Sequence, residues 1–387
     1  MRVPPKEILN DIQYGAFIVF VVSLIFSESI KLIILYGVMI PVFFIQLYRR
    51  DIGIRLGLLE YGFIAFVLTS VLSGLFASNI PEYIKGMKDV TRIAVLFFIS
   101  AAFSGQRRIT TVLWCLYAAT AAMAVFGVYE AVKFHKPLDL HMLGHYNYTA
   151  MYLGIISNAL IGTIVFSEIR TKAMKAAAVM LLFITITATV MTTMRAAFVT
   201  LFIFSAIVVF TKRKSLVSKA IAAGFAAFAL AAAYVFKPMW TKLSSGESLI
   251  RRLYIWKYAL KIITETRALG AGLNNFKYTF PAAIEGGRTI YDAHSLYLNT
   301  AVQSGVAGLC SVFAIGIGFV RRWFSITGGA FEEEIRYAAL GAALVIFVGG
   351  IFDTTLHHET GMLFAILTGF MAGLPSAEPV RGTTDAR

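Results

Sequence analysis

The chain has 387 residues, of which 58% are hydrophobic and only 14% are charged, and its formal net charge is +14. Soluble domains contain about half apolar and about a quarter charged residues, so this composition excludes an ordinary soluble domain. Repeated apolar runs of about 20 residues, each long enough to cross a bilayer, predict a polytopic helical membrane protein. The basic residues lie in loops and at helix ends, which is typical of membrane proteins and argues against nucleic-acid binding.

The hydropathy pattern predicts an all-α fold with about 12 transmembrane helices. We expect them near residues 13–28, 31–48, 58–76, 91–104, 110–131, 148–166, 174–191, 196–211, 218–236, 295–320, 337–352 and 356–373. The chain thus divides into helices one to nine within 1–236, a long polar segment at 237–294, and helices ten to twelve with a tail in 295–387.

Basic residues mark alternate loops and set the predicted orientation, because short loops rich in Lys and Arg face the cytoplasm. These residues are Arg49, Arg50, Arg55, Arg107, Arg108, Arg170, Lys172, Lys175, Lys212, Arg213, Lys214, Lys219, Arg321 and Arg322. The other loops, including the long segment 237–294, then face outward. All six histidines lie in or beside these outer loops. We therefore expect the functional site at the outer face.

The long outer segment contains a predicted amphipathic helix. Apolar residues recur there at helical spacing, namely Leu253, Trp256, Leu260 and Ile263. Basic residues lie between them, namely Arg252, Lys257 and Lys261. Such a helix either lies on the membrane surface or packs against the bundle, and the two interpretations are compatible.

Two arginines of the outer face are candidate anion ligands. Arg195 lies in TTMRAAFV between two apolar runs, and Arg252 precedes Trp256 by four residues. Arg195 alone is equally consistent with a side chain that reaches the headgroups, and Arg252 alone with a solvated helix face. Together they favour an anionic ligand, because guanidinium stays charged and binds phosphate with two parallel hydrogen bonds.

A second group of cations lies at the outer entry to the fourth predicted span. If EYIKGMKDVTRIA is helical, Lys85, Lys88 and Arg92 share one face. This face is suited either to a phosphate group or to anchoring among lipid headgroups. We retain Lys88 and Arg92 as candidate substrate-binding residues.

The sequence GAGLNNF follows the amphipathic helix and contains Gly270, Gly272 and Asn274. No Gly-Lys-Ser/Thr follows these glycines, so they do not form a nucleotide-binding loop. They predict a tight turn in which backbone approaches backbone or ligand.

His294 begins the tenth predicted span, two residues after Asp292. A histidine exchanges protons near neutral pH, and a neighbouring carboxylate orients it or raises its basicity. A histidine at this position is also consistent with ordinary packing. The roles of the other outer histidines stay open, and a metal site is the alternative for His141, His145, His357 and His358, although no diagnostic spacing supports it.

The quoted residues resemble the O-antigen ligase and polymerase superfamily. The resemblance rests on RLYIW from Arg252, on GAGLNNF with Asn275, and on H-S-x9-G-x-x-G, whose fixed positions are His294, Ser295, Gly305 and Gly308. GHYNYTAMYL, with Asn147, and Arg195 also resemble family positions. The ligase pattern continues with two threonines, which Leu309 and Cys310 replace here. The resemblance is closest over residues 144–308.

The resemblance implies a metal-independent, inverting glycosyltransferase without a cofactor, at the periplasmic face of the bacterial inner membrane. Its donor would be a glycan on undecaprenyl pyrophosphate, and a ligase would transfer it to a lipid A–core sugar. Arg195 and Arg252 would bind the pyrophosphate, and His294 would take the proton of the acceptor hydroxyl. Asn147, Asn275, Asp292 and Ser295 are further candidate substrate-binding residues. A polymerase of the same superfamily, a glycan transferase to protein, and a transporter of an anionic lipid are the alternatives.

Overall fold

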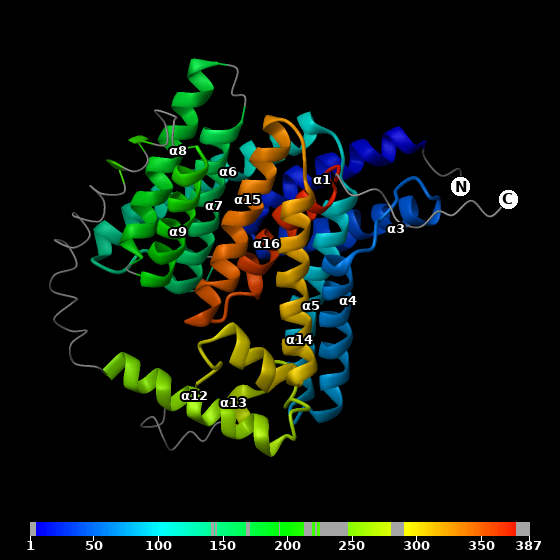
Figure 1. Ribbon diagram of the computed structural model, residues 1–387, viewed down its shortest axis with the longest axis vertical. Helices are drawn as coiled ribbons and strands as arrows, with labels where there is room; N and C mark the ends of the chain where they lie inside the picture. Colours follow the sequence, from blue (N-terminus) through cyan, green and yellow to red (C-terminus); the bar gives the residue numbers. More distant parts are fainter. Residues whose placement is uncertain are drawn as a thin grey trace.

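The computed structural model describes residues 5–140, 143, 145–167, 171–192, 194–212, 219–220, 223–224, 247–279 and 290–376. These residues form a helical bundle and contain no strand (Figure 1). The helices are α1 (Lys6–Phe26), α2 (Glu28–Ile34), a π-helical turn (Leu35–Met39), α3 (Ile40–Tyr48), α4 (Leu58–Ser73), α5 (Ile80–Ala102), α6 (Gln106–Phe134), α7 (Tyr146–Phe166), α8 (Lys172–Met191), α9 (Arg195–Thr211), α12 (Glu247–Glu265), α13 (Phe276–Thr279), α14 (Leu296–Ser325), α15 (Ala330–Phe347) and α16 (His358–Ala372). Short 3₁₀ turns follow α4 (Gly74–Phe76) and α15 (Gly349–Ile351).

The predicted helical membrane fold is confirmed. Within the described part of the chain, eight helices are long and apolar enough to cross a membrane, and the shorter apolar α9 is additional. The expected count of about 12 is not confirmed. The predicted span 218–236 lies almost wholly outside the described residues. The fourth predicted span, at 91–104, covers only the second half of α5, which begins at Ile80 because Asn79 caps it and Pro81 fits its first turn.

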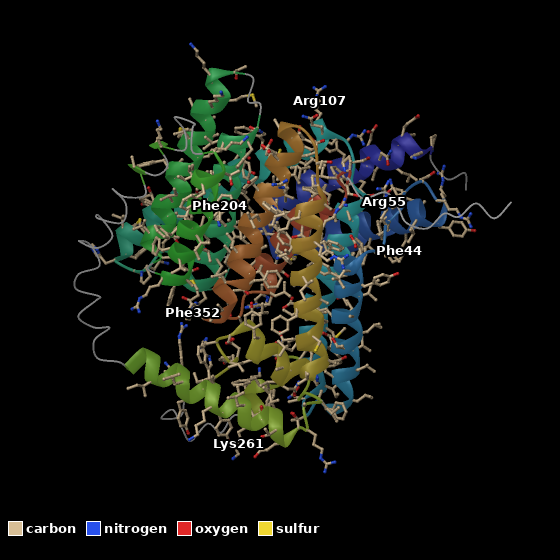
Figure 2. All side chains as sticks on the ribbon, viewed as in Figure 1. Phe44, Arg55, Arg107, Phe204, Lys261 and Phe352 are labelled. Atoms are coloured by element: carbon tan, nitrogen blue, oxygen red, sulfur yellow. The ribbon has the colours of Figure 1, made fainter. Side chains whose placement is uncertain are left out.

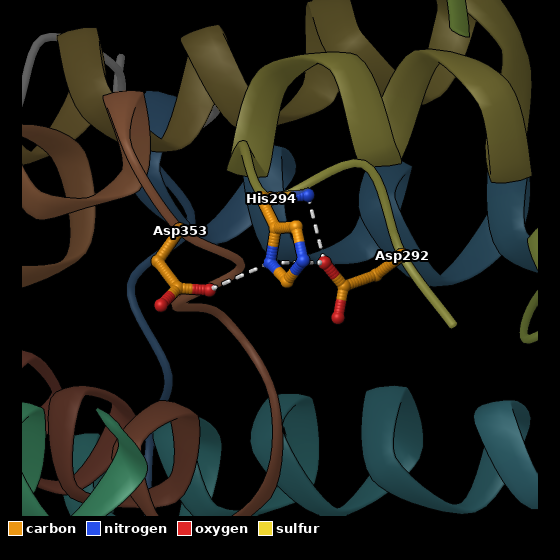
Figure 3. A group of neighbouring side chains, drawn as sticks. All are labelled: Asp292, His294 and Asp353. Atoms are coloured by element: carbon orange, nitrogen blue, oxygen red, sulfur yellow. Dashed lines mark hydrogen bonds and ion pairs between the residues drawn. The ribbon is translucent and has the colours of Figure 1, made fainter. Parts of the chain in front are cut away.

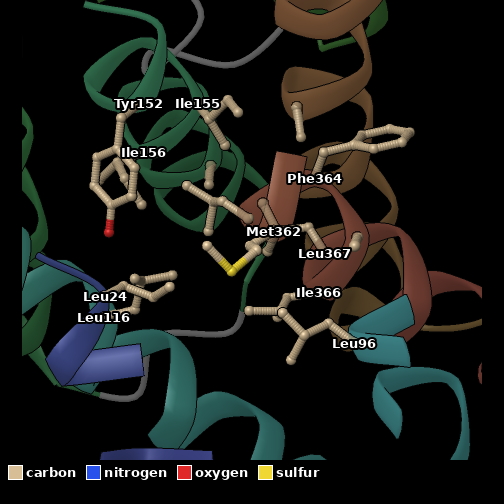
Figure 4. Packing of buried hydrophobic residues seen from close by; sticks show 14 of the residues in the cluster. Leu24, Leu96, Leu116, Tyr152, Ile155, Ile156, Met362, Phe364, Ile366 and Leu367 are labelled. Carbon is tan, nitrogen blue, oxygen red and sulfur yellow. The ribbon is translucent and has the colours of Figure 1, made fainter. Parts of the chain in front are cut away.

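Two helices, α7 and α16, form the centre of the bundle. Nearly all their side chains are buried, so these helices are apolar on every side rather than along one stripe. Figure 4 shows Met362 and Leu367 of α16 among Ile155 and Ile156 of α7, with Leu96 of α5 nearby. This rigid centre supports the loops at the beginning of both helices.

Small residues allow α4 and α14 to approach each other closely. A Cβ on Gly62 of α4 would lie 2.8 Å from the backbone nitrogen of Ile315. A Cβ on Gly318 of α14 would lie 2.5 Å from the backbone nitrogen of Leu59. Close backbone contact at small residues is how helices associate where lipid removes the hydrophobic driving force between them. This contact fixes the long α14 along the side of the bundle.

A break in α14 at Gly305 joins this helix to the turn that follows α12. Gly305 has a φ of +73°, so its helical hydrogen bonds are interrupted. The carbonyls of Val302 and Gln303 instead accept the N–H groups of Ala271 at 2.7 Å and Gly272 at 3.0 Å. The tight turn predicted from the glycines is thus confirmed, and its partner is the backbone of α14.

The amphipathic helix α12 crosses the end of the bundle below α9 and α15 (Figure 1). The apolar residues predicted from the sequence divide between two faces, because Leu253 and Leu260 are 52% and 54% exposed, whereas Trp256 and Ile263 are partly buried. The buried face consists of Ile255, Ala259 and Ile262, which pack with residues next to α14. Small and β-branched residues thus form the packed face, and the larger leucines lie outside it.

The helices α7, α9, α14 and α16 all begin at the end of the bundle covered by α12 (Figure 1). Arg107, from a loop predicted to be cytoplasmic, lies at the opposite end from Phe352 and Lys261 (Figure 2). The loops predicted to face outward therefore meet at one end of the molecule. The positive ends of four helix dipoles converge there, which favours negative charge at this end.

Candidate active site

The backbone around His294 is held in place just before α14. His294 has a left-handed conformation with a φ of 47°. The carboxylate of Asp292 accepts its N–H at 2.7 Å, which closes the kind of short turn that aspartate favours. The N–H of Ala293 donates to Oδ1 of Asn299 on α14 at 3.3 Å. These contacts fix the direction of the imidazole.

Two carboxylates flank the imidazole ring of His294 (Figure 3). Its Nδ1 lies 3.3 Å from Oδ1 of Asp292 and 3.8 Å from Oδ1 of Asp353. Nε2 does not take part in either of these two contacts. A carboxylate beside Nδ1 favours the tautomer that carries its proton there, so Nε2 is the nitrogen able to accept a proton.

Asp353 lies between the 3₁₀ turn after α15 and the start of α16, and it is only 2% exposed. Its Oδ1 accepts the N–H of Thr354 at 2.8 Å, and its Oδ2 accepts Nδ2 of Asn147 on α7 at 3.0 Å. The Thr354 hydroxyl donates to Oδ1 of Asp292 at 3.2 Å. A single network therefore connects Asn147, Asp353, Thr354, Asp292 and His294.

The network changes the proton affinities of its members. The nearby carboxylate of Asp353 raises the pKa of His294, and the charge of Asp292 adds to this effect, although burial and Arg252 oppose it. Burial alone would raise the pKa of Asp353, but His294, the Thr354 N–H and Arg252 outweigh it and lower the pKa. Asp353 is therefore ionised, and it stabilises the imidazolium form of His294.

This coupling predicts the response of His294 to the substitution Asp353→Asn. Loss of the negative charge removes the largest cause of the raised pKa, so the pKa of His294 should fall. NMR titration of the histidine ring in the detergent-solubilised protein measures the change. Asp51→Asn, at the opposite end of the bundle, is the control and should leave this titration unchanged. A constant or higher pKa in Asp353→Asn would contradict the assigned contact.

Arg252 and Arg195 bring two cations to the same site. Arg252 of α12 is half-buried and donates to the carbonyl of Phe352, the residue before Asp353. Its charge acts on His294 and Asp353 and also repels Arg195, the exposed first residue of α9. Among the described residues neither arginine forms an ion pair with a carboxylate. Two guanidinium groups that form no direct ion pair among the described residues are a suitable site for an anion such as phosphate.

Asn275 lies away from this site and has a structural environment. Its side chain is fully buried and makes four hydrogen bonds, to Ser78, Leu273 and both the N–H and the carbonyl of Asn79. These bonds join the turn after α12 to the loop before α5. The amide groups of Asn275 are therefore engaged within the protein.

The other candidate residues from the sequence differ in their surroundings. Ser295 is the next residue, is buried, and donates to the carbonyl of Gly350 at 3.4 Å. Arg92 of α5 forms ion pairs with Glu28 at 3.3 Å and Asp89 at 3.5 Å. Lys88, one turn earlier, is exposed. Lys88 and Arg92 thus belong to a separate group on α5.

Among the described residues, the remaining histidines do not form a cluster of ligands around one point. His141 lies outside the described residues. His145 caps α7 by accepting the N–H of Asn147 at 3.1 Å, and His358 pairs with Asp89 at 3.1 Å. His357 packs edge-on against Tyr148.

Within the described residues, the group of three or more potential metal ligands is Asp292, His294 and Asp353. The Oδ1 atoms of both carboxylates already accept hydrogen bonds from Thr354. A metal ion would also lie beside the positive charge of Arg252.

The sequence reasoning missed Asp353. It is a single acidic residue between two apolar runs, in the outer loop that also holds His357. Asp and Glu are rare so close to membrane spans and commonly mark a functional site, so this position was a recognisable signal.

A comparison with known protein families matches the part of the chain that contains both arginines and the histidine of the candidate site. The family model described as O-antigen ligase matches residues 177–313, which include Arg195, Arg252 and His294. No curated protein matches the chain. The match to the family model, over about a third of the chain, supports a relation to the O-antigen ligase/polymerase superfamily.

Proposed function

We propose that the protein transfers an O-antigen glycan from undecaprenyl pyrophosphate to a sugar hydroxyl of lipid A–core, at the periplasmic face of the inner membrane. This proposal rests mainly on the position of His294. It lies between two carboxylates and within the electrostatic influence of Arg252, which in turn lies near Arg195. A proton acceptor next to a cationic anion site is the arrangement that glycosyl transfer from a pyrophosphate requires.

The residues fit a single displacement. The acceptor oxygen attacks the anomeric carbon, and the bond from that carbon to the phosphate oxygen breaks. The electron pair of this bond leaves with undecaprenyl pyrophosphate, whose increased negative charge Arg195 and Arg252 stabilise. The proton of the acceptor hydroxyl passes to Nε2 of His294, and Asp353 stabilises the imidazolium that forms. Attack opposite the leaving group inverts the anomeric centre.

The energy source and the lipid substrates agree with this scheme. The donor carries its own leaving group, so no nucleotide site and no metal ion are needed. Both proposed substrates carry lipid chains, and the site lies at one end of a bundle of apolar helices. The sugar groups can therefore reach His294 while their lipid chains stay in the bilayer.

Polymerisation of the glycan on its lipid carrier is the second candidate. The replacement of the two family threonines by Leu309 and Cys310 favours it. Both residues lie in α14 beyond the kink at Gly305, on the opposite side of the kink from His294. The same chemistry serves both reactions, and only the acceptor differs.

Reconstitution tests the proposal. Purified protein in nanodiscs is mixed with undecaprenyl-pyrophosphate glycan and either lipid A–core or a second undecaprenyl-linked repeat, with EDTA and without nucleotide. We expect transfer to lipid A–core. Transfer only to the second repeat would identify a polymerase, and absence of any transfer would overturn the proposed function.

A further inference from the structure

A polar cavity of about 410 Å³ lies on the other side of Asp292, between α5, α13, α14 and the start of α16. Asp292 and Thr354, two members of the His294 network, form part of its wall. Its volume lies within the range of roughly 300–1,000 Å³ that is usual for small-molecule sites. The cavity is therefore large enough for a ligand and adjoins the His294 network through Asp292 and Thr354.

The wall of the cavity has an unused hydrogen-bonding group. Ser304 lines the cavity and is only 4% exposed, and its Oγ has no hydrogen-bond partner among the described residues. A buried hydroxyl without a partner is destabilising, so a ligand hydroxyl that hydrogen-bonds to it would be favoured. The amide side chains of Asn299 and Gln303 lie on the same wall. This wall is suited to a ligand with several hydroxyl groups.

The cavity also offers an aromatic surface. Tyr291 lines it and is 66% exposed, so its ring is not held in the core. Tyr148 forms part of the wall as well. A sugar ring has hydroxyl groups at its edge and an apolar C–H face, and the face packs well on an exposed tyrosine. Hydroxyl partners beside an aromatic ring therefore indicate a sugar site.

The charges around the cavity are already paired with each other. Glu82 contacts Lys85 at 2.7 Å and Lys277 at 3.1 Å, and both lysines lower its pKa. Asp89 contacts Arg92 at 3.5 Å and His358 at 3.1 Å. A charged ligand would have to break these pairs. The arginine site is different, because neither Arg195 nor Arg252 forms a direct ion pair with a carboxylate among the described residues.

From these observations we propose that the cavity binds the acceptor sugar, and that this sugar is an uncharged pyranose whose reacting hydroxyl reaches past Asp292 to Nε2 of His294. The assignment to the acceptor rests on the proposed function. The donor pyrophosphate then lies on the arginine side of His294 and the acceptor on the cavity side. The proton to be removed lies between them.

The test compares two exposed tyrosines. Their rings lie at similar distances from Nζ of Lys277, at 5.2 Å for Tyr278 and 5.4 Å for Tyr291, but only Tyr291 lines the cavity. We expect Tyr291→Ala to raise the KM for the acceptor about tenfold with an unchanged KM for the donor, and Tyr291→Phe to restore it. Tyr278→Ala is the matched control and should leave both constants unchanged.

A binding measurement separates this proposal from the proposed function. Saturation-transfer NMR on the intact protein uses three probes, namely methyl glucoside, the anionic methyl glucuronide and the cationic methyl glucosaminide. We expect the neutral glucoside to bind best and its binding to be lost in Tyr291→Ala and weakened in Ser304→Val, which replaces the hydroxyl with methyl groups. If the parent protein transfers no glycan, the proposed function fails, and the NMR result alone decides the sugar site. Preferred binding of a charged probe, or equal effects of Tyr291→Ala and Tyr278→Ala, would overturn the proposal.

Discussion

Replacing His294 with asparagine is expected to lower the rate of glycan transfer by about 10²–10⁴-fold, the usual contribution of a general base. Asparagine is the informative substitution because His294 has a φ of 47°, a conformation that asparagine tolerates better than alanine does. The variant should therefore keep its fold and both substrate KM values while kcat falls. Rates at saturating donor and acceptor, with thermal unfolding of the same samples, measure these effects.

The matched control for this substitution is His135→Asn. His135 is exposed, has a φ of 51° and caps α6, so it shares the backbone conformation of His294 without its carboxylates. Its substitution should leave kcat unchanged. The pH profile gives an independent check, because transfer in the parent protein should rise with pH as His294 loses its proton. In Asp353→Asn this rise should shift to lower pH, since the pKa of His294 falls. An unchanged kcat in His294→Asn would exclude the base role.

Replacing Arg195 or Arg252 with alanine is expected to lower kcat/KM for the donor by roughly 10²–10³-fold, as loss of one preorganised charge-stabilising group does in other enzymes. The two effects should not add in the double variant, because both groups act on the same pyrophosphate. Arg252→Lys should fall between Arg252→Ala and the parent, since lysine keeps the charge but loses the planar pair of donors. Transfer kinetics with varied donor concentration provide the measurement.

Lys257→Ala is the control for this series, because Lys257 is an exposed cation on the same helix, α12. Calorimetry with inorganic pyrophosphate supplies a readout that does not depend on transfer. The parent protein should bind pyrophosphate, and the Arg195→Ala/Arg252→Ala double variant should not. Equal binding by both proteins would show that the phosphate site lies elsewhere.

The sequence was sufficient to predict the helical membrane fold and the end of the bundle that carries the site. Hydropathy indicates the length of each apolar run, and the charges of the loops indicate how each predicted helix is oriented across the membrane. The loops that contain Arg195 and His294 could therefore be assigned to one face. Both signals are local in the sequence. They explain why His294, Asp292 and Arg252 were recognised together.

The partners across the fold could not be predicted in this way. Asp353 meets Asn147 across a separation of 206 residues, and no local pattern connects them. Asn275 was expected to bind substrate, yet its side chain bonds to Asn79, which is 196 residues away. The residues of α12 that pack against the bundle were not distinguished either, since hydrophobicity alone ranks Leu253 above Ala259, whereas close packing selects the smaller side chain.

The break in α14 connects two parts of the candidate site through the main chain. Two main-chain carbonyls just before Gly305 bind the turn after α12, so the helix that contains Arg252 and the helix that His294 precedes are joined by backbone hydrogen bonds. Substitutions of surface side chains leave these hydrogen bonds intact. The spacing between Arg252 and His294 is therefore expected to be insensitive to such substitutions.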